Sequence, residues 1–362
     1  MTPRERVLAV LHGELPPVVP FTMYGNKLQQ CRAEREMRNR GMCILDRRTP
    51  VKTHRPNVHR TEEAWYDDAG NRFTRTRFES PAGVLTTLHE RFEGLSWCRE
   101  KLFKTPDDYK ALRFFIEDEQ YEEDYAEFVR AERAFGGDAI VRAGLKLEPL
   151  QALISGELMG IETFCIEWMD RRDELLALYE ALVEQRRRLY PLVAESPATH
   201  ANYGGNVMPE ITGPRDFERY YLPHYNEAAE IFHEHGKLLG GHFDANCGPL
   251  AASIAKTDLD YIEAFTPAPD TDMTLAEARA AWPDKTLWLN FPSSLHLRPD
   301  EDVEEATVGL LNELESPAGV IMGITEDVPE DRWRQSCTAI MDGLDRHAAE
   351  NPGAYRERGR AN

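Results

Sequence analysis

Residues 237–266 are KLLGGHFDANCGPLAASIAKTDLDYIEAFT, two apolar runs at Lys237–Asp244 and Tyr261–Thr266 on either side of a short predicted helix, Ala251–Ala255. Short apolar runs bounded by glycine, asparagine and aspartate are typical of buried strands. A helix between two strands favours a parallel pair, because parallel strands need a long crossover connection. The stretch therefore predicts an α/β fold.

The same alternation of strand and helix recurs along the chain and predicts a (β/α)8 barrel. The other six predicted strands are Val18–Tyr24, Met42–Asp46, Ala139–Leu145, Thr199–Gly205, Thr286–Phe291 and Gly319–Thr325. Apolar residues spaced three and four apart predict the longer helices. These are Asp173–Val193, Pro214–His235, Leu275–Trp282, Val303–Leu314 and Trp333–His347.

The length of 362 residues suits a single barrel domain, which we predict over residues 1–350, followed by a polar tail at 351–362. One segment, about 53–138, is too long for a single crossover. Within it, Arg72–Phe78 and Gly83–Phe92 have the alternation of two strands joined through Ser80-Pro81. We therefore expect a β-hairpin insertion between the second and third barrel strands.

The net charge of −20 argues against nucleic acid and anionic membrane surfaces as partners. No apolar stretch approaches the roughly 20 residues that span a bilayer, and the first residues have no signal-peptide pattern. The six cysteines are scattered without close pairs, as expected for thiols in a reducing compartment. We therefore expect a cytoplasmic protein without a membrane segment.

Catalytic groups of such barrels lie at the carboxyl ends of the strands. The end of the fifth predicted strand carries His242, Asp244 and Cys247 within six residues, and Glu326 follows the eighth. Imidazole and thiolate suit zinc, and a catalytic zinc takes three protein ligands. The pattern predicts a metal site formed by His242, Cys247 and Glu326, with Asp244 as the alternative to Cys247.

Each of these residues also has a structural interpretation. A histidine beside glycines is often a hydrogen-bonded or substrate-contacting residue, and Cys247 can pack as a small apolar side chain. Glu326 can cap the last helix. His242, Asp244 and Glu210 are candidates for proton transfer, while three other side chains at strand ends are expected to bind substrate. Those three are Tyr24, Asn206 and Asn290.

Several short motifs resemble the uroporphyrinogen decarboxylase superfamily over nearly the whole chain. They are TPRERVL at 2–8 with Gly13-Glu14 and Val18-Val19-Pro20, SPAG at 80–83, Leu222-Pro223, the approach from Gly236 to His242, and GITEDVP at 323–329. The resemblance implies a (β/α)8 barrel. It also implies one of two chemistries: decarboxylation of porphyrinogen acetates without a cofactor, or zinc-dependent methyl transfer to or from corrinoid proteins or thiols.

The decarboxylases of this superfamily carry an arginine-rich segment after the first strand, whereas residues 24–30 here are YGNKLQQ. The methyltransferases hold zinc through an H-x-C motif after the fifth strand and a further ligand after the eighth. His242 matches the histidine of this motif and Asp244 occupies the position of its cysteine, with Cys247 three residues further on. Glu326 is the candidate for the further ligand after the eighth strand. The match is closer to the methyltransferase branch that includes demethylases of methoxy-aromatic compounds.

The leading hypothesis is a zinc-dependent methyltransferase that moves a methyl group from a small O- or N-methylated substrate to a separate corrinoid protein. The first alternative is a metal-free lyase similar to uroporphyrinogen decarboxylase, in which His242, Asp244 and Glu210 transfer protons. The second is a barrel that binds a ligand or a corrinoid protein without catalysis. The superfamily that the chain resembles often forms dimers, so the resemblance allows a homodimer, but the sequence leaves the oligomeric state open.

Overall fold

The computed structural model describes residues 1–92 and 95–355. The chain divides into two compact units. The barrel unit comprises residues 1–50, 125–144 and 196–362, of which 356–362 lie outside the described residues, and the insertion unit comprises residues 51–124 and 145–195. The prediction of one domain over 1–350 stays a prediction, and most of the predicted tail at 351–362 lies outside the described residues.

The barrel unit contains a closed sheet of eight parallel strands, which confirms the predicted (β/α)8 barrel. Each barrel strand pairs with the barrel strand that follows it in the chain, and β14 pairs with β1 to close the barrel. The strands are β1 (Phe21–Tyr24), β2 (Cys43–Arg48), β9 (Ala139–Gly144), β10 (His200–Tyr203), β11 (Leu238–His242), β12 (Tyr261–Phe265), β13 (Thr286–Leu289) and β14 (Val320–Ile324).

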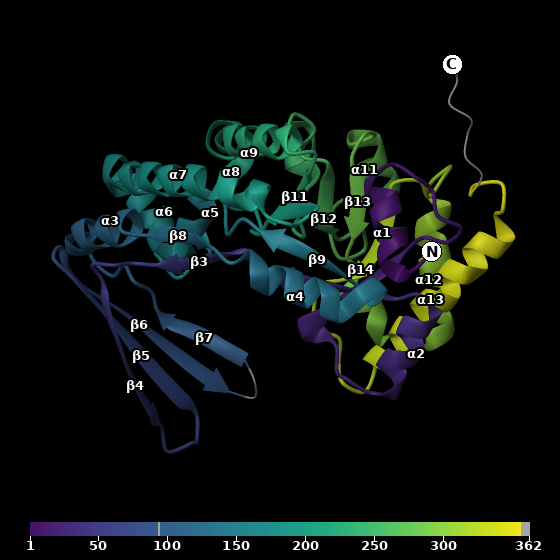
Figure 1. Cartoon of the computed structure of the whole chain (residues 1–362), viewed down its shortest axis with the longest axis horizontal. Coiled ribbons are helices and arrows are strands. Elements are labelled where there is room, and N and C mark those ends of the chain that lie inside the picture. Colours follow the sequence, from purple (N-terminus) through teal and green to yellow (C-terminus); the bar gives the residue numbers. More distant parts are fainter. Residues whose placement is uncertain (93–94, 356–362) are drawn as a thin grey trace. The chain divides into compact units, whose positions relative to one another are not determined.

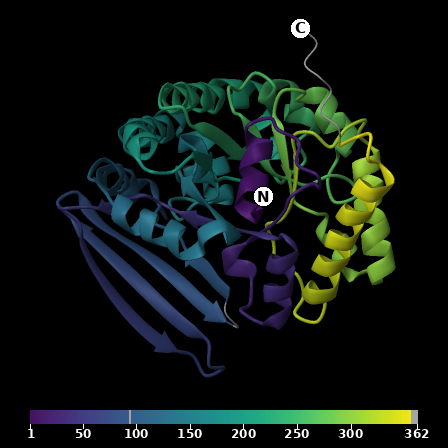
Figure 2. The ribbon, with the colours of Figure 1, turned by 45° about the vertical axis from the view of Figure 1, so that its right-hand side comes forward.

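Helices of the barrel unit lie outside the strands, as Figure 2 shows for the α12 and α13 pair near the carboxyl end of the chain. Thr274 caps α11 through the predicted capping box with Glu277. The helices are α1 (Pro3–Leu11), α2 (Arg32–Arg40), α4 (Tyr125–Phe135), α8 (Pro209–Tyr220), α9 (Leu222–Glu234), α10 (Ala251–Ile254), α11 (Leu275–Ala281), α12 (Asp300–Asn312) and α13 (Trp333–Glu350).

The helix predicted over Pro214–His235 was wrong as a single element, because α8 ends at Tyr220 and α9 begins at Leu222. Pro223 lies in the first turn of α9, where a missing N–H costs nothing. The same proline could not continue a helix from α8, since it lacks the donor and its ring clashes with the preceding turn. Apolar spacing alone does not reveal this break.

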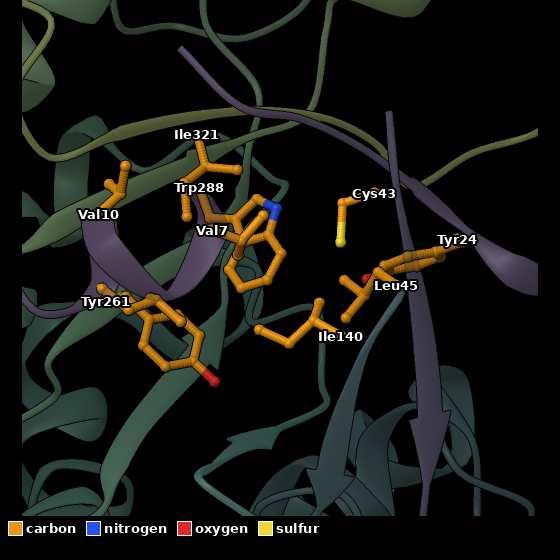
Figure 3. Close-up of a cluster of buried hydrophobic side chains, with 10 residues drawn as sticks. Val7, Val10, Tyr24, Cys43, Leu45, Ile140, Tyr261, Trp288 and Ile321 are labelled. Carbon is orange, nitrogen blue, oxygen red and sulfur yellow. The ribbon is translucent and has the colours of Figure 1, made fainter. Parts of the chain in front are cut away.

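A buried apolar cluster joins α1 to the strands of the barrel (Figure 3). Val7 and Val10 of α1 pack there beside Trp288 and Tyr261, and the Thr286 hydroxyl at the start of β13 donates to the Val10 carbonyl at 3.5 Å. The polar atoms of both rings are satisfied: the Trp288 indole donates at 2.9 Å and the Tyr261 hydroxyl at 2.6 Å. Because α1 packs at the end of the barrel where β13 begins, the reactive side chains belong at the carboxyl ends of the strands.

The insertion unit contains more sheet than the predicted hairpin. The hairpin itself is confirmed as β5 (Arg72–Ser80) and β6 (Gly83–Phe92). It is the middle of a four-stranded antiparallel sheet whose outer strands are β4 and β7 (Figure 1). The remaining elements are β4 (His59–Tyr66), β7 (Leu95–Glu100), the pair β3 (Val51–His54) and β8 (Gln120–Glu123), and the helices α3 (Tyr109–Glu117), α5 (Pro149–Ile154), α6 (Ile161–Asp170) and α7 (Arg172–Glu195).

Within the described residues, no helix is both long enough and apolar enough to span a membrane.

Candidate active site

The strand β11, with the sequence LLGGH, brings His242 to the carboxyl end of the barrel. Its two glycines are required by packing. A Cβ on Gly240 would lie 2.0 Å from the ring of Tyr261, and a Cβ on Gly241 would lie 2.7 Å from the ring of Phe243. Both rings are fully buried. The glycines therefore allow large aromatic side chains to fix β11, and with it His242, in the barrel wall.

A buried carboxylate, Glu263 of β12, is the centre of the site. Arg142 Nη1 lies 2.8 Å from Glu263 Oε1, a close ion pair outside hydrogen-bond geometry, and the Tyr24 hydroxyl donates a short hydrogen bond to the same oxygen. The other oxygen, Oε2, accepts from His242 Nδ1 at 2.7 Å and from Asn202 Nδ2 at 3.4 Å. Four barrel strands besides β12 thus contribute a side chain around one carboxylate.

Electrostatics fix the ionisation of this cluster. Burial opposes the charge on Glu263, but the Arg142 and His242 cations outweigh it and hold the pKa of the carboxyl far below its usual range. Burial likewise opposes the charge on Arg142, yet Glu263 and the nearby tyrosines raise its pKa. Burial raises the pKa of Tyr24, so its hydroxyl stays a neutral donor. A buried charge with this many partners forms a fixed interior network.

His242 links the interior network to the second carboxylate, Asp244. His242 Nε2 lies 3.0 Å from Asp244 Oδ2, on the side of the ring opposite to Glu263. Burial alone would lower the pKa of His242, but the Glu263 charge and the hydrogen bonds to both carboxylates raise it to about 10. The ring is therefore an imidazolium at neutral pH and donates from both nitrogens.

Asp244 carries one of three unsatisfied side-chain atoms that this network has among the described residues; the other two are Arg142 Nη1 and Asn202 Oδ1. Asp244 Oδ1 is buried and has no hydrogen-bond partner among the described residues. Buried polar atoms without a partner are rare in folded proteins, because each loses its hydration without compensation. The atom lies on the carboxylate that contacts His242, where a bound molecule with a donor group would satisfy it.

The other residues that were predicted to transfer protons or to bind substrate lie in different environments. Tyr24 is in the Glu263 network, whereas Glu210, on α8, is exposed and accepts from Asn246 Nδ2 at 3.3 Å. Asn206 is exposed on the loop before α8. The amide of Asn290 bridges strand ends: it donates to Thr266 at 3.1 Å and accepts from the Thr325 N–H at 3.0 Å.

The three predicted zinc ligands do not come together. Cys247 is buried with its thiol 3.2 Å from the Ala245 carbonyl, and burial raises the pKa of this thiol well above its usual range. Glu326 is exposed and accepts from the Ser293 hydroxyl at 2.7 Å. Across residues 1–92 and 95–355, no three His, Cys, Asp or Glu side chains are arranged to hold a metal ion. His242, Cys247 and Glu326 therefore do not fit zinc.

Arg142, Glu263 and Asn202 were not predicted as site residues. A signal for Arg142 existed. It is the one charged residue of β9, AIVRAG, and 4% of its surface is exposed. An arginine inside a buried strand requires an anionic partner, but the strand alone does not say which of the 63 acidic residues provides it.

Comparisons with known proteins leave the family open. No family model and no curated protein matches the chain. Solved structures that resemble it include a candidate vitamin-B12-independent methionine synthase from Listeria monocytogenes, with 11% identity, a TM-score of 0.40, and coverage of 62% of this chain and 68% of that one. Another is the IolI protein with a bound zinc atom, with 11% identity, a TM-score of 0.32, and coverage of 65% and 86%. The resemblance to the uroporphyrinogen decarboxylase superfamily stays a prediction.

Proposed function

We propose that the barrel unit is a metal-free lyase that removes CO2 from a small carboxylated substrate by acid–base chemistry. The observation that carries this proposal is the continuous chain from Glu263 through His242 to Asp244. A protonated imidazole held between two carboxylates is a positioned proton donor. The unsatisfied Oδ1 of Asp244 adds a place where a substrate donor group would bind.

In this mechanism the Glu263 network orients His242 and stabilises its positive charge, but it takes no part in the bond changes. When the C–C bond to the carboxylate breaks, its electron pair stays on the substrate carbon and CO2 leaves. Asp244 accepts the Nε2 proton of His242 and delivers it to that carbon, where a new C–H bond forms. His242 is left as neutral imidazole, and a proton from water restores the starting state.

A cation that would bind a substrate carboxylate lies close to this network. Arg47, exposed on β2, places its guanidinium 3.8 Å from the centre of the Tyr24 ring. Arg47 Nη2 donates to Asn26 Oδ1 at 3.2 Å, whereas the next residue, Arg48, pairs with the carboxylates of Asp46 at 2.5 Å and Glu127 at 3.4 Å. Arginine suits this role because its planar fork binds a carboxylate through two parallel hydrogen bonds.

The proposal is tested by measuring CO2 release from a panel of keto, hydroxy and aromatic acids, with and without EDTA. In His242→Gln we expect the rate to fall about 10²- to 10⁴-fold with EDTA having no effect. The matched control is His233→Gln, because His233 also pairs with a carboxylate, Asp260 at 2.9 Å, but is exposed on α9. Equal rates in the two variants would contradict the proposal. So would an activity that EDTA abolishes and zinc restores.

Zinc-dependent methyl transfer to a corrinoid protein is the second candidate. One observation favours it: His242 Nε2 lies 3.0 Å from Asp244 Oδ2. These two residues occupy the H-x-C positions of the methyltransferases that the sequence resembles. A zinc ion would need further ligands, and Cys247 and Glu326 contact other groups. Metal analysis separates the two candidates: one zinc per chain, lost in His242→Ala, would favour methyl transfer over the metal-free lyase.

A further inference from the structure

The insertion unit contains a cavity of about 210 Å³, and all of its lining residues belong to that unit. The cavity has an apolar part, formed by side chains such as Leu147 and Leu182, and a polar part. The polar part is rich in positive charge. It includes three basic side chains, from the end of β3, the segment before α5, and α7, which are Arg55, Lys146 and Arg186.

A single buried carboxylate, Glu119, serves two of these cations. Its Oε1 lies 2.6 Å from Lys146 Nζ, and its Oε2 makes a short ion pair with Arg55. Glu157, the other acidic residue of the lining, has a side chain that is 61% exposed and contacts His89 at 3.0 Å. Burial lowers the pKa of both Arg55 and Lys146, although Glu119 opposes that effect.

Arg186 is the third cation, and it has no carboxylate of its own. It is 4% exposed, and its Nε donates to the Leu147 carbonyl at 2.8 Å. Among residues 1–92 and 95–355 no acidic side chain lies within ion-pair distance of it. A buried guanidinium without an anion is costly, since its charge has lost most of its hydration.

Gln185, beside Arg186 in the lining, has an unsatisfied acceptor. Its Nε2 donates to the Glu117 carbonyl at 3.1 Å, which orients the amide. The opposite atom, Oε1, is buried without a partner among the described residues, and the residue is 2% exposed. The wall of the cavity thus has a cation that lacks an anion next to an acceptor that lacks a donor.

The backbone of the lining is also strained at one point. Lys146 has a φ of 67°, in the left-handed region that favours glycine. Its side chain nevertheless reaches Glu119 and lies 4.7 Å from the ring centre of Tyr121. Such conformations persist where the surroundings enforce them, and they concentrate at binding sites.

We propose that this cavity binds a small α-hydroxy or α-amino acid. The carboxylate pairs with Arg186, and the neighbouring hydroxyl or amino group donates to Gln185 Oε1. At roughly 30 Å³ per water the cavity has room for about seven waters, so an acid of about six heavy atoms fits. The site does not depend on the lyase proposed for the barrel unit, because none of its residues takes part in that chemistry.

Calorimetry on the full chain tests the proposal with four probes of similar size: L-lactate, L-alanine, propionate and lactamide. We expect saturable 1:1 binding of lactate or alanine, with weaker binding of propionate, which lacks the donor, and of lactamide, which lacks the charge. Whichever of lactate and alanine binds more tightly identifies the donor as hydroxyl or amino. No saturable binding of either below about 10 mM, an affinity of roughly 3 kcal/mol or less, would overturn the proposal.

The decisive variant is Arg186→Gln, with Arg187→Gln as its control. Arg187 is the next residue on α7, but its side chain is 49% exposed and pairs with Glu184 at 2.7 Å. We expect Arg186→Gln to weaken binding by about tenfold or more, whereas Arg187→Gln changes it less than about twofold. Equal affinities of the two variants would contradict the assignment.

A second measurement does not depend on the folding of a variant. Crystals of the unmodified chain soaked in 3-bromolactate, which keeps both the carboxylate and the α-hydroxyl, give an anomalous signal that locates the acid. We expect bromine inside the cavity, with the carboxylate on Arg186 and the hydroxyl on Gln185. Bromine found only outside the cavity would overturn the proposal.

Discussion

Two buried carboxylates, one in each unit, have the same set of neighbours but different surroundings. Each accepts a hydrogen bond from a tyrosine hydroxyl and contacts two basic side chains. In the barrel unit the group is Glu263 with Arg142, His242 and Tyr24, and in the insertion unit it is Glu119 with Arg55, Lys146 and Tyr121.

The two groups differ in how the chain holds them. The Glu263 side chain is 0% exposed, and each of its partners lies on a barrel strand. The Glu119 side chain is 8% exposed, and its cations, Arg55 and Lys146, lie in connecting segments with 26% and 28% exposure. Strands therefore lock an ionic group into a fixed network that can orient a reactive histidine. Loops leave the same ionic group beside a cavity that can admit a ligand.

The largest difference in stability between the two units is expected when each carboxylate is neutralised. Glu263→Gln leaves Arg142 buried without an anion and His242 with Asp244 alone, and we expect the free energy of unfolding to fall by about 3–5 kcal/mol. Glu119→Gln leaves partly hydrated cations, and we expect a loss of about 1–2 kcal/mol. Urea unfolding of both variants checks this. Equal losses would show that strands and loops hold the two groups equally firmly.

The barrel interior is expected to accept a charged histidine only where carboxylates compensate it. His200 of β10 has no such partner, and burial lowers its pKa to about 3. Below about 6.5 the unfolded chain binds a proton that the folded chain refuses, so stability falls as the pH drops from 6.5 towards 3. We expect His200→Leu to remove about 2 kcal/mol of the loss between pH 6 and 4. An unchanged acid slope in urea titrations would contradict this.

The smallest difference is expected from the tyrosine hydroxyls. Tyr24→Phe removes one donor to Glu263 and Tyr121→Phe removes one donor to Glu119, while both aromatic rings stay. We expect a loss of about 1.5 kcal/mol for Tyr24→Phe and about 0.5 kcal/mol for Tyr121→Phe, because the second site is closer to solvent. Thermal unfolding resolves a difference of this size. A larger loss in the insertion unit would reverse the order that the comparison predicts.

The sequence predicted the barrel well because its strands are buried on both faces. Runs such as Tyr261–Thr266 contain apolar residues almost throughout, and burial of both faces demands that composition. The outer strands of the insertion sheet were not predicted. All but one residue of β4, HRTEEAWY, are exposed, so no apolar face marks it as a strand.

The candidate site was predicted only in part, because some of its residues are far apart along the chain. His242 and Asp244 are two residues apart on one strand end, so a local pattern reveals them. Glu263 and Arg142 are 121 residues apart in sequence and meet only through the closed barrel. Cys247 was expected to join His242 because it is near in sequence, but the turn after β11 directs its thiol to the backbone of that turn. Local density of reactive residues does not give side-chain direction.

The chemistry of the site depends on His242 being a cation held between Glu263 and Asp244. Nuclear magnetic resonance of the chain labelled with ¹⁵N-histidine reports the protonation of each ring nitrogen. We predict that both nitrogens of His242 carry protons at pH 7, and that the ring loses one only as the pH rises towards about 10. A ring that is neutral at pH 7, or whose Nε2 lacks its proton throughout, would contradict the account.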